Sequence, residues 1–260
     1  MSSPLKAAAL ELGLPVTDQV NDVLGAVTGG AELGVVVAFG QLIKTNLLDA
    51  LPFVNLHFSL LPRWRGAAPV ERAFLEGDAE TGVCLMELEK GLDTGGVYRR
   101  VSTPIAPEDT GVSLLTRLSA IGSTMLVDAL APGTVAALGI AEPQVGDITW
   151  AQKLDASDHL IDWRDSTERI DRVIRLGGAW TIFRGKRIKI IGAVVSSGTE
   201  GAPGTLAELD VRCGDVGSMR LVAVQPEGKP PMDAVAWRNG VRPITGERFE
   251  GGLQPVATRT

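Results

Sequence analysis

Three polar side chains stand at alternate positions in NLHFS, residues 55–59, inside an otherwise apolar stretch. With the period of two that a β-strand has, Asn55, His57 and Ser59 face one side of the strand. An imidazole titrates near neutral pH, and a neighbouring amide can donate to it or orient it, which suits general acid–base chemistry. A hydrogen-bonded polar patch at a sheet edge is the alternative interpretation, and for a single histidine it is the commoner one.

The elements around this segment predict an α/β fold with a Rossmann-like open sheet. Residues 34–39, GVVVAF, form a β-branched run of the kind that lies in a parallel sheet with both faces buried. Strands and helices then alternate, as in open α/β sheets. We expect a helix at 69–76, strands at 81–89 and 95–105, and a helix at 111–130. Ligands bind beyond the carboxyl ends of such strands, which is where the polar segment lies.

The second half of the chain has a different pattern. Residues 139–156 are polar and irregular, which indicates a linker. A helix expected at 165–177 is followed by short β-rich segments with Gly and Pro turns, which predict a small, OB-like β-barrel. We therefore divide the chain into a catalytic α/β domain at 1–138, a linker at 139–156 and a C-terminal β-barrel domain at 157–260.

Composition limits the class of protein. With 260 residues, 45% of them hydrophobic and 22% charged, the chain has the composition of an ordinary globular protein. No apolar run approaches the roughly 20 residues that span a bilayer, so we expect no membrane partner. The start of the sequence lacks the cationic and apolar regions of a secretory signal. Cys84 and Cys213 are far apart and lack metal-ligand spacing, so we expect reduced thiols and a cytoplasmic protein. As a separate expectation, we take the protein to be a monomer.

Two long motifs resemble those of a known family. The first is Asn-x-His-x-Ser-Leu-Leu-Pro-x-x-Arg-Gly at 55–66, and the second joins Thr-Gly-Val at 81–83 to Leu-Asp-Thr-Gly at 92–95. They resemble the active-site stretch of the folate-dependent formyltransferases, most closely of the members that act on methionyl-tRNA. Shorter similarities, such as FRGKRIKI at 183–190 and RPITGERF at 242–249, extend the resemblance over nearly all of the chain.

The resemblance implies roles for single residues. In the family pattern Asn55, His57 and Asp93 are catalytic. The formyl donor, 10-formyltetrahydrofolate, is bordered by residues of two segments, namely Ser59, Leu60, Leu61 and Pro62, and Phe39 and Gly40. We expect no metal, because His57 and His159 are the only histidines and neither belongs to a Cys/His/Asp cluster.

The implied reaction is the attack of a neutral α-amine on the formyl carbon, which turns the carbonyl oxygen into an oxyanion. Asn55 and His57 can each donate an N–H to that oxygen, and the loss of one such donor costs about 3–4 kcal/mol in comparable acyl-transfer sites. Asp93 can hold His57 in a useful protonation state and relay the proton from the attacking nitrogen to the leaving N10. No covalent enzyme intermediate is needed.

Charge is unevenly distributed. Residues 157–260 contain 15 Lys/Arg and 13 Asp/Glu, a net charge of +2, whereas residues 1–156 contain 10 and 18, a net charge of −8. The positive half suits an anionic partner, which the resemblance implies is the initiator methionyl-tRNA. The candidate tRNA contacts are Arg63, Arg65, Arg184, Lys186, Arg187 and Lys189. Ordinary ion pairs and a solvated surface are the alternative interpretations of these cations.

The chain departs from the family pattern at its start. Members of the family begin with a β-α-β unit with a Gly-rich first strand and turn, and SSPLKAAALELGLPV, residues 2–16, resembles the segment after that unit. We therefore expect an incomplete N-terminus, and activity of these 260 residues as they stand does not follow from the resemblance. The alternatives are a formyltransferase for an amino-sugar nucleotide or for glycinamide ribonucleotide, and a non-catalytic tRNA-binding fragment.

Overall fold

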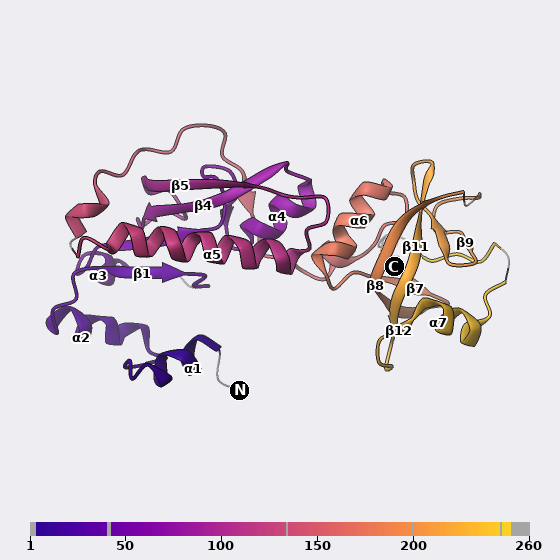
Figure 1. Cartoon of the computed structure of the whole chain (residues 1–260), viewed down its shortest axis with the longest axis horizontal. Coiled ribbons are helices and arrows are strands. Elements are labelled where there is room, and N and C mark those ends of the chain that lie inside the picture. Colours follow the sequence, from indigo (N-terminus) through magenta and orange to yellow (C-terminus); the bar gives the residue numbers. More distant parts are fainter. Residues whose placement is uncertain (1–3, 41–42, 134, 199, 245, 251–260) are drawn as a thin grey trace, which may run out of the picture. The chain divides into compact units, whose positions relative to one another are not determined.

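The computed structural model describes residues 4–40, 43–133, 135–198, 200–244 and 246–250. The helices labelled in Figure 1, with three short 3-10 helices, are α1 (Pro4–Glu11), η1 (Val20–Asp22), α2 (Val23–Thr28), α3 (Thr45–Leu48), α4 (Pro69–Glu76), α5 (Gly111–Leu130), η2 (Val135–Leu138), η3 (Ser157–His159), α6 (Thr167–Leu176) and α7 (Ala234–Val241). The strands are β1 (Gly34–Val37), β2 (Phe53–His57), β3 (Arg65–Gly66), β4 (Glu80–Glu87), β5 (Val97–Pro104), β6 (Trp150–Ala151), β7 (Trp180–Phe183), β8 (Lys186–Ser197), β9 (Leu206–Ala207), β10 (Asp210–Arg212), β11 (Gly217–Pro226) and β12 (Met232–Asp233).

The chain groups into two compact units. The first unit consists of Met1–His57, Cys84–Arg100 and Gly122–Gly146, and the second of Phe58–Val83, Val101–Ile121 and Asp147–Thr260. Three elements, β4, β5 and α5, contribute residues to both units.

A four-stranded sheet with the order β1-β2-β4-β5 contains the first two polar residues of that segment, Asn55 and His57. Strand β1 runs parallel to β2, with Val36 opposite Asn55. Strand β4 runs antiparallel to β2, with Cys84 opposite His57. Strand β2 therefore has a hydrogen-bonded neighbour on each side, and its apolar side chains are buried, with Leu56 only 5% exposed. Together with the alternating helices, this sheet confirms the predicted α/β open-sheet fold.

Local signals in the sequence explain where α4 begins and ends. Pro69 stands in its first turn, where a missing backbone N–H is harmless. Gly77 ends it with a φ of 75°, a left-handed conformation that glycine adopts without steric cost. The four elements predicted between residues 69 and 130 are all present, with bounds within two residues of those expected.

The prediction that the run at 34–39 is buried on both faces is wrong. Strand β1 forms, but Val35 is 41% exposed and Val37 46% exposed, and its burial alternates along the strand. The reason lies in the order of the sheet, since β1 is its end strand among the described residues. A β-branched run therefore identified a strand but not its environment.

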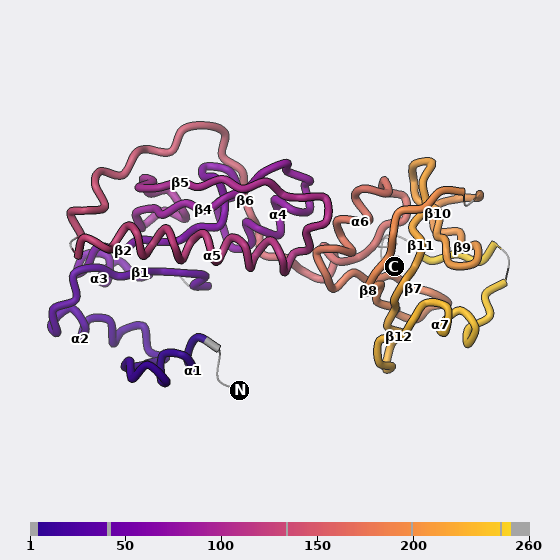
Figure 2. Tube along the Cα trace, viewed as in Figure 1, coloured from indigo at the N-terminus to yellow at the C-terminus, as the bar shows by residue number. Residues whose placement is uncertain are grey.

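The C-terminal part of the second unit is a closed β-barrel. Its strands follow the order β7-β8-β11-β10-β9, with β12 paired to β11, and Figure 2 shows β10 between β11 and β9. The two end strands are joined by one short segment, because Arg248 bridges Thr205 beside β9 and Glu250 bridges Ile182 in β7. Backbone hydrogen bonds thus continue around the sheet, which confirms the predicted small β-barrel.

Aromatic side chains fill the barrel. Trp163, Phe183, Trp237 and Phe249 are at most 6% exposed, and neighbouring ring centroids lie 4.9 to 5.9 Å apart. The indole N–H of Trp163 donates to Thr181 Oγ1 over 3.0 Å, so its one polar group is satisfied inside the core. Helices α6 and α7 pack against the long barrel strands, as Figure 1 shows.

Candidate active site

Strand β2 places two of the predicted catalytic side chains. Asn55 and His57 are two residues apart and therefore project from the same face. Asn55 is half-buried, and His57 is 5% exposed at the carboxyl end of the strand. The predicted strand 55–59 is shorter than expected, because β2 ends at His57 and Ser59 lies in the turn that follows.

Asp93 lies beside His57, although 36 residues separate them in the sequence. The distance from His57 Nδ1 to Asp93 Oδ2 is 3.7 Å, and their side chains are 5% and 9% exposed. This separation is longer than a hydrogen bond but within the range of an ion pair. Both side chains are shielded from water, so the carboxylate can orient the imidazole and take part in its proton transfers. The structure thus brings together the imidazole and the carboxylate of the predicted site.

The loop that carries Asp93 has a constrained backbone. Asp93 has a φ of 51°, an unusual value for a residue other than glycine. Gly95 approaches β4 so closely that an added Cβ would lie 2.0 Å from the carbonyl oxygen of Glu87. The Gly-bounded loop therefore requires glycine where it touches the strand, and it holds Asp93 at a defined position.

Gln144 holds the same loop, and the sequence pattern did not identify it. Its Nε2 donates to the carbonyl oxygens of Asp93, over 2.9 Å, and of Gly95, over 2.8 Å. A backbone bridge between Val97 and Glu142 brings its segment to this loop. Gln144 lies in the stretch predicted to be a linker, so no local signal distinguished it from a surface glutamine.

The residues predicted to border the folate differ in their environment. Ser59 is fully buried, and its hydroxyl donates to the carbonyl oxygen of Arg63 over 2.6 Å, which stabilises the turn. Leu61 is 2% exposed and Leu60 half-buried, whereas Phe39 is 38% exposed. The remaining two of these residues are the buried Pro62 and the exposed Gly40. Their predicted folate contacts stay a prediction.

A small cavity lies directly after this turn in the second unit. It has a volume of about 230 Å³ and is lined by Leu60, Arg63, Trp64, Asp78, Ala79, Glu80 and Thr81. The Arg63 guanidinium and the Trp64 indole N–H both donate to the Asp78 carboxylate, and Arg63 also stacks on the Trp64 ring at 4.5 Å. The hydrogen bond to Asp78 raises the pKa of Arg63. Arg63 is therefore engaged within the protein.

The other candidate tRNA contacts fall into two groups. Arg65 is 9% exposed in β3, and Arg184 forms an ion pair with Glu247. Lys186, Arg187 and Lys189 are exposed on β8 and have no carboxylate partner among the described residues. Arg187 and Lys189 project from one face, because the side chains between and beyond them are buried, and Arg187 stacks on Trp180 at 4.2 Å. These three cations form the available positive surface, which we call the β8 basic face.

Among the described residues, no helix is both long and apolar enough to cross a membrane. Within the same part of the chain, no group of three or more His, Cys, Asp or Glu side chains is arranged to hold a metal ion.

An amide, an imidazole and a carboxylate at the end of one sheet suit the chemistry of a group-transfer enzyme, and comparison with known proteins identifies the family. Family models described as "Formyl transferase" and "Formyl transferase, C-terminal domain" match residues 17–130 and 153–242. Methionyl-tRNA formyltransferases of Roseobacter denitrificans and a Jannaschia species are 41% and 42% identical to this chain, over 96% and 95% of it and 85% of each relative. The chain belongs to the formyltransferase family.

A solved structure supports the same fold. HypX from Aquifex aeolicus, determined in complex with tetrahydrofolic acid, superposes with a TM-score of 0.65. The match covers 90% of this chain and 43% of that chain at 16% sequence identity, so it shows a shared fold.

Proposed function

We propose that this protein transfers a formyl group from 10-formyltetrahydrofolate to the α-amino group of methionyl-initiator tRNA, the modification used in translation initiation. The observation that carries the proposal is the pairing of His57 with Asp93 at 3.7 Å, with Asn55 on the same face of β2. The names of the two relatives at about 40% identity support the substrate, and the folate bound by HypX supports the donor.

The chemistry follows from the properties of the three side chains. The amine nitrogen attacks the formyl carbon, the carbonyl π bond breaks, and an oxyanion forms. N–H donors from Asn55 and His57 stabilise the oxyanion. Asp93 orients the His57 imidazole, and these two groups carry a proton from the attacking nitrogen to the departing N10. Collapse of the oxyanion breaks the bond from carbon to N10 and releases tetrahydrofolate.

The β8 basic face is the surface that we propose contacts the tRNA backbone. Its three cations are exposed, whereas Arg63, Arg65 and Arg184 are buried or engaged. We therefore propose that these three arginines stabilise the protein and do not contact the tRNA directly. We also propose the division into 1–138, 139–156 and 157–260, which the family matches at 17–130 and 153–242 support. A cytoplasmic location is proposed as well, which the two free, buried thiols of Cys84 and Cys213 support. A monomer is a further proposal.

The test is a formylation assay on three acceptors: charged initiator tRNA, an amino-sugar nucleotide and glycinamide ribonucleotide. We expect formylation of the tRNA, and a His57→Gln variant should lower kcat by about 100- to 1000-fold by loss of an oxyanion donor. His159→Gln is the matched control, since among the described residues the only hydrogen-bond partner of that imidazole is the Gly177 carbonyl oxygen. Formylation of the sugar nucleotide alone would contradict the proposal. So would salt-dependent tRNA binding without turnover on any acceptor.

A further inference from the structure

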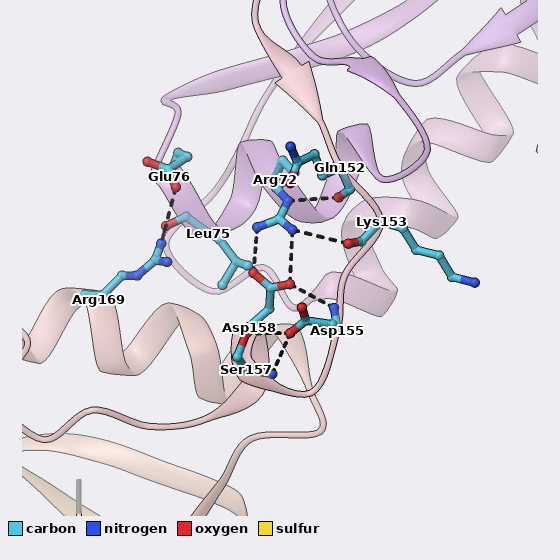
Figure 3. Close-up of polar contacts among 9 residues, drawn as sticks. All are labelled: Arg72, Leu75, Glu76, Gln152, Lys153, Asp155, Ser157, Asp158 and Arg169. Atoms are coloured by element: carbon cyan, nitrogen blue, oxygen red, sulfur yellow. Dashed lines mark hydrogen bonds and ion pairs between the residues drawn. The ribbon is translucent and has the colours of Figure 1, made fainter. Parts of the chain in front are cut away.

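One arginine of α4 holds a segment that lies 80 to 86 residues away in the sequence. The Arg72 guanidinium donates to Asp158 Oδ1 over 2.6 Å and to Asp158 Oδ2 over 3.0 Å. It also donates to the carbonyl oxygens of Gln152, over 3.0 Å, and of Lys153, over 3.5 Å. Figure 3 shows these contacts converging on the one guanidinium. We call the Arg72–Asp158 pair and the two carbonyl contacts the Arg72 clamp.

The carboxylate of Asp158, which accepts from Arg72, is itself held by hydrogen bonds from its own segment. Asp158 is 17% exposed and also accepts the backbone N–H of Asp155 over 2.9 Å. Asp155 in turn accepts the backbone N–H of Ser157 over 2.7 Å (Figure 3). Burial alone would raise the pKa of Asp158, but the hydrogen bonds from Arg72 and Asp155 lower it overall. The segment therefore offers a charged carboxylate in a preformed geometry, and a bidentate guanidinium fits it.

A second tie lies just before the clamp. Strand β3 pairs in parallel with β6, so that Gly66 is opposite Ala151. Ala67 and Ala68 donate their backbone N–H groups to the carbonyl oxygen of Ala151 over 2.8 and 3.2 Å. A Cβ at Gly66, whose φ is 124°, would lie 2.7 Å from that oxygen. Residues 149–158, which the sequence predicted to be largely linker, are thus docked along 64–72.

A third tie joins the end of α4 to α6. Arg169 and Arg172 both donate to the carbonyl oxygen of Leu75, the latter over 3.0 Å, and Arg169 also pairs with Glu76. Two cations at the carboxyl end of α4 also complement the negative end of its dipole. Helix α4 is therefore connected to the barrel by α6 directly and by the 152–158 segment, which leads into α6.

We propose that Arg72 and Asp158 are positioning residues for the tRNA substrate. This inference rests on the proposed function. The clamp anchors the segment through which the chain enters the barrel, so it sets the orientation of the β8 basic face relative to α4. A displacement of a bound substrate by about 1 Å can lower the reaction rate about 100-fold. The rate with tRNA should therefore depend on the clamp that fixes the orientation of its proposed binding face. If the clamp only stabilised the fold, its loss would change the KM values of both substrates by the same factor.

Steady-state kinetics with each substrate varied in turn separates these roles. We expect Arg72→Ala and Asp158→Ala each to raise the KM for methionyl-tRNA by about tenfold, with the KM for the formyl donor changed less than about twofold. The double variant should resemble the singles, since the two side chains act as one pair. Arg72→Lys keeps the charge but loses the bidentate geometry, so an intermediate KM for tRNA is expected. Arg164→Ala is the control, because Arg164 pairs with Asp162 only two residues away and its side chain is 70% exposed.

Hydrogen exchange of the protein without substrates provides the second measurement. In Arg72→Ala, the amides of 152–158 should exchange faster, while those of β8 and β11 keep the wild-type rates. An unchanged KM for tRNA, or equal increases in both KM values, would overturn the proposal. If the wild-type protein formylates no methionyl-tRNA, the proposed function fails. In that case, unchanged hydrogen exchange of residues 152–158 in Arg72→Ala would separately show that Arg72 does not anchor this segment.

Discussion

At the scale of residues, the position of the Asp93 carboxylate determines how the His57 imidazole is oriented for proton transfer. Asp93 lies 3.7 Å from the imidazole and is itself held by its backbone, because Gln144 donates to the carbonyl oxygens on both sides of Thr94. An unusual φ of 51° at Asp93 is thereby stabilised from outside the loop. The two hydrogen bonds that Gln144 donates to this loop end on backbone carbonyl oxygens, so we treat its contribution as positional.

Gln144→Leu should therefore lower kcat by about tenfold or more, because loss of the two donors lets the Asp93 loop shift relative to His57. Steady-state formylation assays measure the effect. Gln225→Leu is the matched control, since its Nε2 also donates to a carbonyl oxygen in a turn, that of Lys229 in the barrel. A Gln144 variant with the wild-type kcat and its normal fold would show that the loop needs no such support.

At the scale of elements, α5 begins at a buried carboxylate. Asp109, 4% exposed, accepts from the backbone of Ala106 over 2.8 Å and from the Ser113 hydroxyl over 2.9 Å. Arg117, two turns into the helix, donates to both of its carboxylate oxygens, and that contact is the main reason why the pKa of Asp109 falls to about 2. The Asp109 carboxylate thus connects the start of the helix to its second turn through hydrogen bonds.

This pKa predicts an acid-sensitive contribution to stability. The pKa in the folded protein lies below the ordinary value of 3.8, so the contribution is fully present above about pH 4 and is lost as the pH falls toward 2. With allowance for the partly exposed Arg117, it amounts to about 1–2 kcal/mol. Urea unfolding of wild type and Asp109→Asn at pH 7 and pH 2.5 should show a difference that shrinks in acid. An equal difference at both pH values would contradict this assignment.

At the scale of the whole molecule, the barrel is closed by its last described residues. Arg248 and Glu250 bridge the two end strands, and Phe249 between them points into the core, where it is 2% exposed against Trp163 and Trp237. The same three residues thus satisfy the backbone of the strands and fill the interior. Closure and core packing are coupled at this one segment.

Phe249→Ala should destabilise the protein by about 3–5 kcal/mol, the usual cost of removing a buried aromatic side chain. The free energy of unfolding from urea titration, followed by tryptophan fluorescence, measures it. Ile244→Ala is the control, because that side chain is 72% exposed and should change stability by less than about 0.5 kcal/mol. A loss below about 1 kcal/mol at Phe249 would mean that the barrel closes without this residue.

The sequence by itself determined the elements and the chemistry of one strand. The period of two that puts Asn55 and His57 on one face, and the Pro and Gly that bound α4, are local properties of the backbone. The resemblance of the two motifs added Asp93 to the site, and the family comparisons agree with the family that it implied.

Only the tertiary structure decided which distant groups meet. Gln144 at the Asp93 loop and Asp158 at Arg72 lie in or beside a stretch without periodic pattern, so nothing local predicted their partners. The exposure of Val35 likewise depends on where β1 stands in the sheet. Periodicity encodes which way a side chain points from its own backbone. What it encounters there depends on the packing of segments far apart in the chain.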